Sequence, residues 1–154
     1  GAKFETWLGS LVAPQEPFYL ITSNENSLDE VIYKSAKIGY ERQIKGGFFA
    51  AKNMTNLTPH FDVNKFIEHP EKFTIVDIRN PSETKLGKIF SSAITIPLPE
   101  LRERVNEIPR DKPIVIHCAA GYRSAAGSSI IEQHVKEVSV FDMSENITKF
   151  STKQ

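Results

Sequence analysis

The only cysteine of the chain, Cys118, lies between an apolar run and a helix-forming segment. Ile114–Ile116 is β-branched throughout, which predicts a buried strand. Residues 124–135 carry apolar side chains at helical spacing, which predicts a helix. We therefore expect Cys118 to stand in a short loop that opens a helix, where a thiolate is readily stabilised.

Three features of this loop favour an anion: the free backbone N–H groups of a helix N-terminus, the positive end of the helix dipole, and the guanidinium of Arg123. Such surroundings lower a thiol pKa from about 8.5 to between roughly 3.5 and 7.5. Cys118 and Arg123 are therefore the predicted catalytic residues. Gly121 is expected to adopt a positive φ that turns the loop amides inward. The predicted substrate-binding residues are Ala119, Ala120, Gly121, Tyr122, Arg123 and Ser124.

Each of these residues also has a purely structural interpretation. A free cysteine is commonly a small buried hydrophobic residue, although such a residue needs no glycine and arginine closing a loop over it. Strand alternation sends His117 to the side opposite Cys118, which favours a packed or hydrogen-bonded histidine over a catalytic base. Tyr122 either shapes the entrance or is an exposed packing residue.

The loop Cys118–Arg123 resembles the C-x-x-G-x-R active loop of rhodanese-like sulfurtransferases. Two further segments are similar to motifs of that family: Thr74–Arg79, followed by Glu83 and Gly87, and Ala93–Leu98. In order and spacing these motifs cover residues from about 58 to about 150, a whole domain of the family. The resemblance implies an α/β fold with a parallel sheet flanked by helices.

The resemblance also implies a chemistry. Cys118 would carry sulfane sulfur as a persulfide, from a small-molecule donor such as thiosulfate or a low-molecular-weight persulfide to a thiophilic acceptor. Asp77 and Arg79 would form a structural pair beneath the active loop, with direct substrate contact as the alternative.

Two other functions remain open. The order His117, Cys118, Arg123 is similar to the cysteine phosphatase signature, but those enzymes have five residues between cysteine and arginine and this loop has four. A domain that keeps the fold could also serve only as a binding or regulatory module.

The beginning of the chain looks like part of a second copy. Glu16–Thr22 aligns with Lys112–Cys118, and Thr22 occupies the cysteine position. We therefore predict half of an inactive rhodanese-like module over residues 1–50, a linker at 51–57 within the polar stretch 45–59, and a rhodanese domain over 58–154. Ser27 is expected to cap the first module's long helix, with Glu30 three residues later, and Gly39 to end it.

An inactive module before an active one resembles the C-terminal part of fusions in which a metallo-β-lactamase-fold persulfide dioxygenase domain comes first. That resemblance implies that the chain is a fragment, that the missing N-terminal domain is a partner, and that a non-haem iron would belong to that domain. Half a sheet has an uncovered edge, so exchange with a second chain in a homo-oligomer is one expectation.

Composition limits the remaining classes. Nineteen basic and nineteen acidic residues give a net charge of zero, which argues against nucleic acid or an anionic membrane as partner. The four histidines are scattered and there is one cysteine, so no metal or other cofactor is predicted for this chain. No apolar run of membrane-spanning length is present, and a lone reactive thiol favours the cytoplasm.

The remaining pattern alternates strands and helices. Strands are predicted near 18–22, 40–44, 73–78, 93–96, 113–117 and 138–141, and helices near 4–11, 28–38, 62–68, 99–107, 124–135 and 144–150. Phe61 and Phe66 are expected to fill the core.

Overall fold

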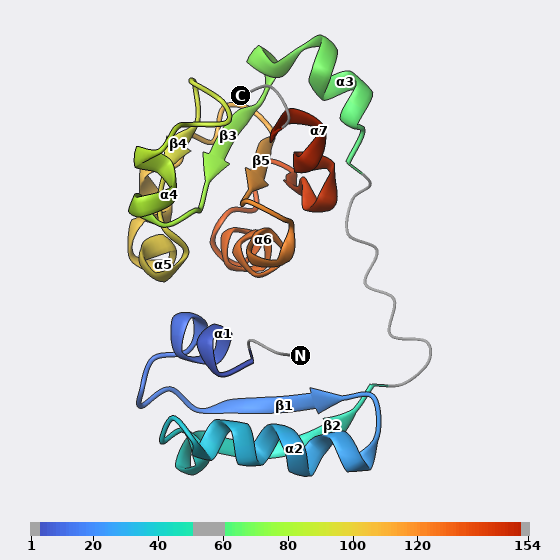
Figure 1. The fold of residues 1–154 in the computed structure, drawn as a ribbon. Coiled ribbons are helices and arrows are strands. Elements are labelled where there is room, and N and C mark those ends of the chain that lie inside the picture. Colours follow the sequence, from blue (N-terminus) through green and yellow to red (C-terminus); the bar gives the residue numbers. More distant parts are fainter. Residues whose placement is uncertain (1–3, 51–60, 152–154) are drawn as a thin grey trace. The chain divides into compact units, whose positions relative to one another are not determined.

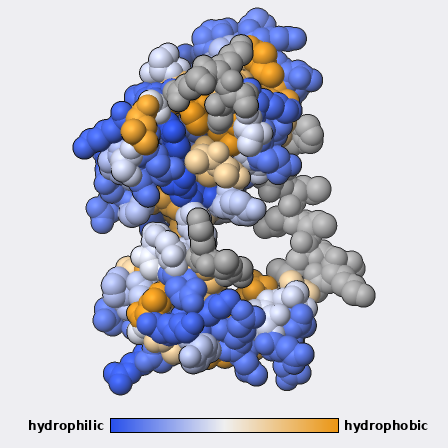
Figure 2. Space-filling model, in the orientation of Figure 1, coloured by the Kyte–Doolittle hydropathy of each residue, from blue (hydrophilic) through white to orange (hydrophobic). Residues whose placement is uncertain are grey.

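The computed structural model describes residues 4–50 and 61–151 and divides the chain into two compact units, Gly1–Asn56 and Leu57–Gln154 (Figure 1). We call them unit 1 and unit 2. In Figure 2 the visible surface of both units is mostly hydrophilic, with apolar side chains in small separate groups. In the part of the chain that the structure describes, no helix has the length and apolar character needed to cross a membrane.

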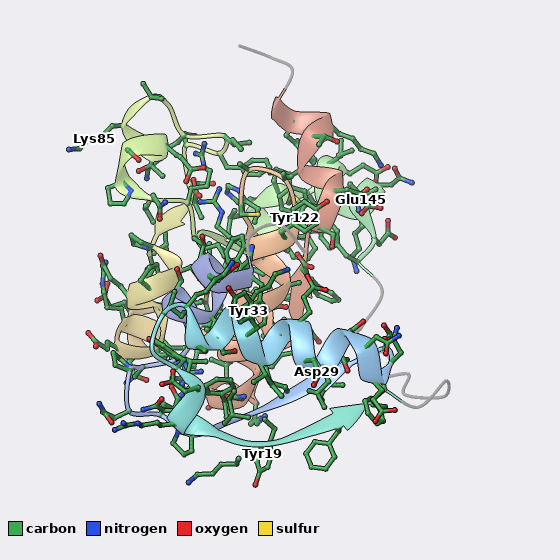
Figure 3. All side chains as sticks on the ribbon, turned by 60° about the horizontal axis from the view of Figure 1, so that its bottom comes forward. Tyr19, Asp29, Tyr33, Lys85, Tyr122 and Glu145 are labelled. Carbon is green, nitrogen blue, oxygen red and sulfur yellow. The ribbon has the colours of Figure 1, made fainter. Side chains whose placement is uncertain are left out.

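Unit 1 is a strand–helix–strand arrangement preceded by a helix. Its elements are α1 (Phe4–Leu11), β1 (Phe18–Thr22), α2 (Glu25–Ala36), the short 3-10 helix η1 (Glu41–Gln43) and β2 (Ile44–Phe49). The two strands are parallel, and α1 and α2 contact each other. Leu20 is buried whereas Tyr19 is 62% exposed, and Tyr19 points away from α2 in Figure 3. The sheet of unit 1 is therefore covered on one face.

Two predictions for unit 1 were wrong. The strand expected near 40–44 runs instead over Ile44–Phe49, as β2. Part of the polar stretch 45–59, within which we placed the linker, is therefore strand. The linker itself, residues 51–57, lies outside the described residues. The glycine at position 47 lies within the strand because Leu28 of α2 packs directly over it. A Cβ on Gly47 would lie only 2.5 Å from Leu28 Cδ1. The helix cap is Asn24 rather than Ser27, whose backbone N–H it accepts at 2.9 Å.

The end of α2 follows the prediction. Gly39 has a φ of +75°, which is the left-handed conformation that favours glycine after a helix. The backbone N–H of Tyr40 then returns to the Ser35 carbonyl at 3.0 Å, and this bond closes the last turn of the helix.

Unit 2 is an α/β domain with a four-stranded parallel sheet, as predicted. Its strands are β3 (Thr74–Asp77), β4 (Ile94–Thr95), β5 (Ile114–His117) and β6 (Val140–Asp142), in the order β4-β3-β5-β6. All residues of β3 and β5 are buried, because neighbours flank both edges and helices cover both faces. The helices are α3 (Val63–Glu68), α4 (Pro81–Lys85), α5 (Leu101–Arg104), α6 (Tyr122–His134) and α7 (Thr148–Ser151).

Two layers of helices hold the sheet (Figure 1). On one face α5 and α6 pack together, and Gly127 of α6 lies so close to β5 that a Cβ would be 2.6 Å from Ile116 Cδ1. On the other face Phe66 of α3, fully buried as predicted, joins Val115 and Ile147 in one apolar cluster, against which Phe61 is partly buried. Neighbouring residues of β5 therefore face opposite layers, which fixes the direction in which the strand delivers the residues after it.

Several boundaries in unit 2 differ from the predictions. The helix expected over 99–107 consists of α5 with a 3-10 turn on either side, η3 (Leu98–Glu100) and η4 (Val105–Glu107). Two further 3-10 turns, η2 (Pro70–Lys72) and η5 (Ser144–Ile147), precede β3 and α7 respectively. Helix α6 begins at Tyr122, two residues earlier than expected. Helix α4 was not predicted, because its five residues are too few to show periodicity.

Candidate active site

The loop between β5 and α6 consists of four residues, Cys118 to Gly121. Gly121 is the N-cap of α6 and has a φ of +92°, so the predicted positive φ is confirmed. A side chain would not fit, because a Cβ on Gly121 would lie 2.7 Å from the backbone carbon of Ser144. Glycine therefore lets the loop turn tightly enough to reach α6 while it packs on the segment after β6.

Cys118 lies inside this turn and is only 2% exposed. Its Sγ accepts the backbone N–H of Gly121 at 3.1 Å, and the Ser124 hydroxyl lies 3.8 Å away. Burial by itself would raise the pKa of the thiol. Hydrogen bonds from the backbone N–H groups of Ala120, Ser124 and Arg123 and from the Ser124 hydroxyl outweigh burial, so the pKa of Cys118 is lowered. The helix start therefore favours the thiolate form of Cys118.

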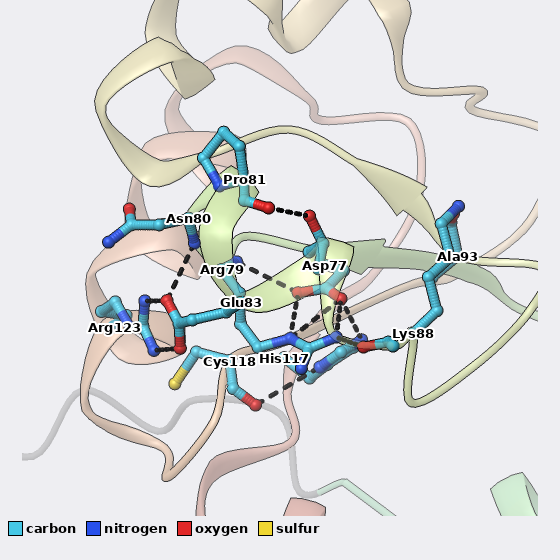
Figure 4. Close-up of polar contacts among 12 residues, drawn as sticks. Asp77, Arg79, Asn80, Pro81, Glu83, Lys88, Ala93, His117, Cys118 and Arg123 are labelled. Carbon is cyan, nitrogen blue, oxygen red and sulfur yellow. Dashed lines mark hydrogen bonds and ion pairs between the residues drawn. The ribbon is translucent and has the colours of Figure 1, made fainter.

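Arg123 does not face the sulfur as an isolated cation. Its guanidinium binds both oxygens of the Glu83 carboxylate on α4, with Nη2 to Oε1 at 2.6 Å (Figure 4). Hydrogen bonding to Arg123 lowers the pKa of Glu83 and raises that of Arg123, so both groups are charged at neutral pH. The thiolate of Cys118 also contributes to the raised pKa of Arg123. The guanidinium therefore interacts with both anions.

Glu83 is the site residue to which the sequence analysis assigned no role. Its carboxylate also accepts the backbone N–H of Asn80 at 3.0 Å and so closes the first turn of α4. The one available signal was its place in the motif that begins at Thr74. A pairing over forty residues of sequence cannot be seen without the fold.

Asp77 and Arg79 form a buried ion pair at the carboxyl end of β3. The guanidinium donates from Nε at 3.0 Å and from Nη2 at 2.7 Å to the Asp77 carboxylate, and Nη2 also reaches the Gly87 carbonyl at 3.0 Å. Asp77 is fully buried and Arg79 is 7% exposed. The pair thus fastens the turn after α4 to the end of the central strand (Figure 4).

His117 lies beside this pair. The imidazole is fully buried, with its ring centroid 5.2 Å from that of Phe90 in an edge-on arrangement. Its Nε2 is 3.9 Å from Asp77 Oδ2 and its Nδ1 is 3.4 Å from the Cys118 carbonyl oxygen. Burial lowers the pKa of His117 more than the nearby Asp77 carboxylate raises it. The ring is therefore a neutral packing group on the side of the strand away from the thiol.

The remaining loop residues differ in exposure. Ala119 and Ala120 are exposed, and Tyr122 is 81% exposed at the first position of α6. Ser124 is fully buried, and its hydroxyl donates to the Gly121 carbonyl at 2.9 Å. The alanines and the tyrosine therefore form the exposed side of the loop, and the serine lies on its buried side. Among the described residues no group of three or more histidine, cysteine, aspartate or glutamate side chains could hold a metal ion.

Comparison with known proteins agrees with this geometry. Residues 62–151 match the rhodanese-like domain, which is more than half of the chain. The chain belongs to the rhodanese-like family.

Relatives of this rhodanese-like domain include an uncharacterized protein, YqhL, from Bacillus subtilis, which is 30% identical over 68% of this chain and 71% of its own length. A sulfurtransferase from Allochromatium vinosum is 31% identical over 52% of this chain and 74% of its own length. Among solved structures, a rhodanese-related protein from Thermoplasma volcanium is similar, with a TM-score of 0.52 and 30% identity over 59% of this chain and 88% of that one.

The rhodanese-like loop has no counterpart in unit 1. There Thr22 is the last residue of β1, and only Ser23 and Asn24 precede α2. The Thr22 hydroxyl donates to the Asn24 carbonyl at 2.9 Å. Unit 1 therefore repeats the strand–helix–strand order of β5, α6 and β6 with a threonine in place of the cysteine and with a shorter connection between strand and helix.

Proposed function

We propose that the protein is a sulfurtransferase that moves sulfane sulfur from thiosulfate or a low-molecular-weight persulfide to a thiophilic acceptor through a persulfide on Cys118. The observation that carries the proposal is the backbone N–H of Gly121 on the Cys118 sulfur, at 3.1 Å, at the start of α6. That arrangement stabilises a thiolate, and the free amides of the loop also suit the terminal sulfur of a persulfide.

The first half-reaction loads the enzyme. The Cys118 thiolate attacks the outer sulfur of the donor, a new S–S bond forms, and the bond between the two donor sulfurs breaks. The leaving group, sulfite from thiosulfate or a thiolate from a persulfide, takes the electron pair. The loop N–H groups and the guanidinium of Arg123 stabilise the negative charge on the transferred sulfur.

The second half-reaction unloads it. An acceptor nucleophile, such as cyanide, sulfite or a thiol, attacks the outer sulfur of the persulfide. The bond to Sγ breaks and the thiolate of Cys118 is restored. The two half-reactions share one covalent intermediate, so we expect ping-pong kinetics.

The test is the intact mass of the protein after incubation with thiosulfate or glutathione persulfide, beside Cys118→Ser. We expect the wild-type chain alone to gain one sulfur atom, which cyanide then removes. A folded protein that gains no sulfur from either donor would favour the binding-module function. Loop length disfavours the phosphatase alternative, because only four residues separate Cys118 from Arg123, one fewer than in the phosphatase signature.

We propose in addition that unit 1 is the second half of an inactive rhodanese-like module. Support comes from the parallel pairing of β1 with β2 across α2, which repeats that of β5 with β6 across α6. The fusion with a metallo-β-lactamase-fold domain stays a prediction. The reading frame upstream of these residues would test it.

A further inference from the structure

The one cation of the active loop is paired with a carboxylate. Between Cys118 and Ser124 the only charged side chain is Arg123, and two of its nitrogens donate to Glu83. The two side chains are only 17% and 31% exposed, so water screens the pair less than it screens a surface pair. The loop therefore presents little net positive charge to an incoming donor.

Neighbouring cations do not replace this charge. The charge of Arg79 is offset by the Asp77 carboxylate, whereas Lys88 keeps its charge but is positioned by the Ala93 carbonyl, to which its ammonium donates at 2.9 Å. Lys85, the cation on α4, points outward into solvent, as Figure 3 shows. Once Cys118 is a thiolate, the group formed by Cys118, Arg123 and Glu83 carries one net negative charge (−1, +1 and −1).

Donors differ in how much charge they add. Thiosulfate brings two negative charges, and with the thiolate three are present throughout the transfer, because the products are an anionic persulfide and sulfite dianion. A protonated organic persulfide, R–S–SH, adds none. The thiolate attacks its outer sulfur, the S–S bond breaks, and R–S⁻ leaves while the proton stays on the transferred sulfur. A loop whose cation is offset by a carboxylate therefore disfavours sulfur transfer from thiosulfate much more than transfer from a protonated organic persulfide.

Two exposed apolar side chains lie close in sequence to the ion pair. Tyr122 directly precedes Arg123 and is 81% exposed, and Leu86 follows Glu83 by three residues and is 88% exposed. Leu86 is the C-cap residue of α4, and its spacing of three residues from Glu83 is close to one helical turn. Such side chains can contact the carbon substituent of an organic persulfide but form no hydrogen bond or ion pair with a sulfonate.

We propose that Glu83 is a specificity-determining residue that makes this site select organic persulfides over thiosulfate as the sulfur donor. The proposal rests on the proposed function. Glu83 acts through Arg123, because its carboxylate offsets the positive charge of the guanidinium. Tyr122 and Leu86 contribute apolar contact with the carbon substituent of the persulfide.

The test compares Glu83→Gln with the wild-type chain. Glutamine removes the charge and keeps one oxygen, which at the Oε2 position can accept from the Asn80 N–H and from Nη1 of Arg123. The second-order rate of sulfur loading is followed by intact mass, with thiosulfate and with benzyl persulfide, without acceptor. We expect the thiosulfate rate to rise about tenfold and the benzyl persulfide rate to stay within about twofold. Glu107→Gln breaks an exposed pair with Arg104 and is the matched control, with both rates unchanged.

The dependence of the loading rate on ionic strength distinguishes an effect of the Glu83 charge from an effect of Glu83 on the position of Arg123. Added salt should accelerate thiosulfate loading of the wild-type chain more than that of Glu83→Gln, because it screens the repulsion. An unchanged or slower thiosulfate reaction in Glu83→Gln, or an equal rise with both donors, would overturn the proposal. A wild-type chain that takes sulfur from neither donor would instead refute the proposed function.

A second variant does not depend on the ion pair. Tyr122 and Leu86 are both highly exposed, so changing both to serine should leave the fold intact. We expect loading from benzyl persulfide to slow about fivefold more than loading from thiosulfate. Equal effects on the two donors would contradict the apolar contact.

Discussion

The backbone N–H of Gly121 donates to the sulfur of Cys118, three residues earlier, at a distance of 3.1 Å. Gly121 has a φ of +92°, the left-handed conformation that lets the chain pass directly from this loop into α6. The backbone of Gly121 also packs against the segment after β6. A Cβ on Gly121 would lie within 3 Å of the Ser144 and Glu145 backbone. The anion site thus depends on one backbone conformation.

Gly121→Ala should therefore destabilise the protein and disable sulfur transfer. We expect a loss of about 3 kcal/mol, because the left-handed conformation is strained for alanine and the methyl group would overlap Ser144. Urea denaturation and persulfide formation by intact mass measure the two effects. The matched control is Gly39→Ala, with a φ of +75° but open space around its Cβ. It should cost only about 1 kcal/mol and leave persulfide formation unchanged.

Hydrogen bonding lowers the pKa of Cys118, so its alkylation by iodoacetamide should reach half its maximum below the pH of an ordinary thiol, about 8.5. The Ser124 hydroxyl becomes a donor to the thiolate when it turns from the Gly121 carbonyl toward the sulfur, so Ser124→Ala should raise the pKa of Cys118 and slow alkylation severalfold at neutral pH. Ser129→Ala, an exposed serine on the same helix, should change nothing. An unshifted profile in Ser124→Ala would show that the backbone N–H groups act alone.

Burial lowers the pKa of His117, so its neutral form is favoured in the folded state. The unfolded chain then binds more protons than the folded chain below about pH 6.5, and stability falls as pH falls through that window. His117→Leu removes the group. Its free energy of unfolding should change less between about pH 7.5 and pH 5 than that of the wild-type chain. Equal changes in the two proteins would mean that His117 does not contribute.

Phe66 belongs to the apolar cluster with Val115 and Ile147, has no exposed surface, and has its ring centroid 5.4 and 5.7 Å from those of Phe90 and Phe150. Phe66→Ala should lower the free energy of unfolding by about 4 kcal/mol, because removal of the ring would leave a cavity that the surrounding helices fill only in part. Its neighbour Ile67 is 52% exposed, so Ile67→Ala should cost less than about 0.5 kcal/mol. Urea denaturation of both variants gives the comparison.

The sequence by itself determined the parts of this protein that depend on neighbours along the chain. The β-branched run before Cys118, the helical spacing after it and the single glycine between them predicted the strand, the helix and the positive φ. Alternation along β5 predicted that His117 would be packed away from Cys118. These features follow from local sterics and from burial that repeats every two or four residues.

Only the tertiary structure decided how the charges are arranged. Arg123 and Glu83 are forty residues apart and meet because β3 and β5 are adjacent parallel strands whose following helices start at the same edge of the sheet. The strand over Ile44–Phe49 likewise depends on Leu28 packing over Gly47, which overrides the turn tendency of two glycines. Such pairings depend on distances in space that spacing along the chain does not contain, so they had to be read from the fold.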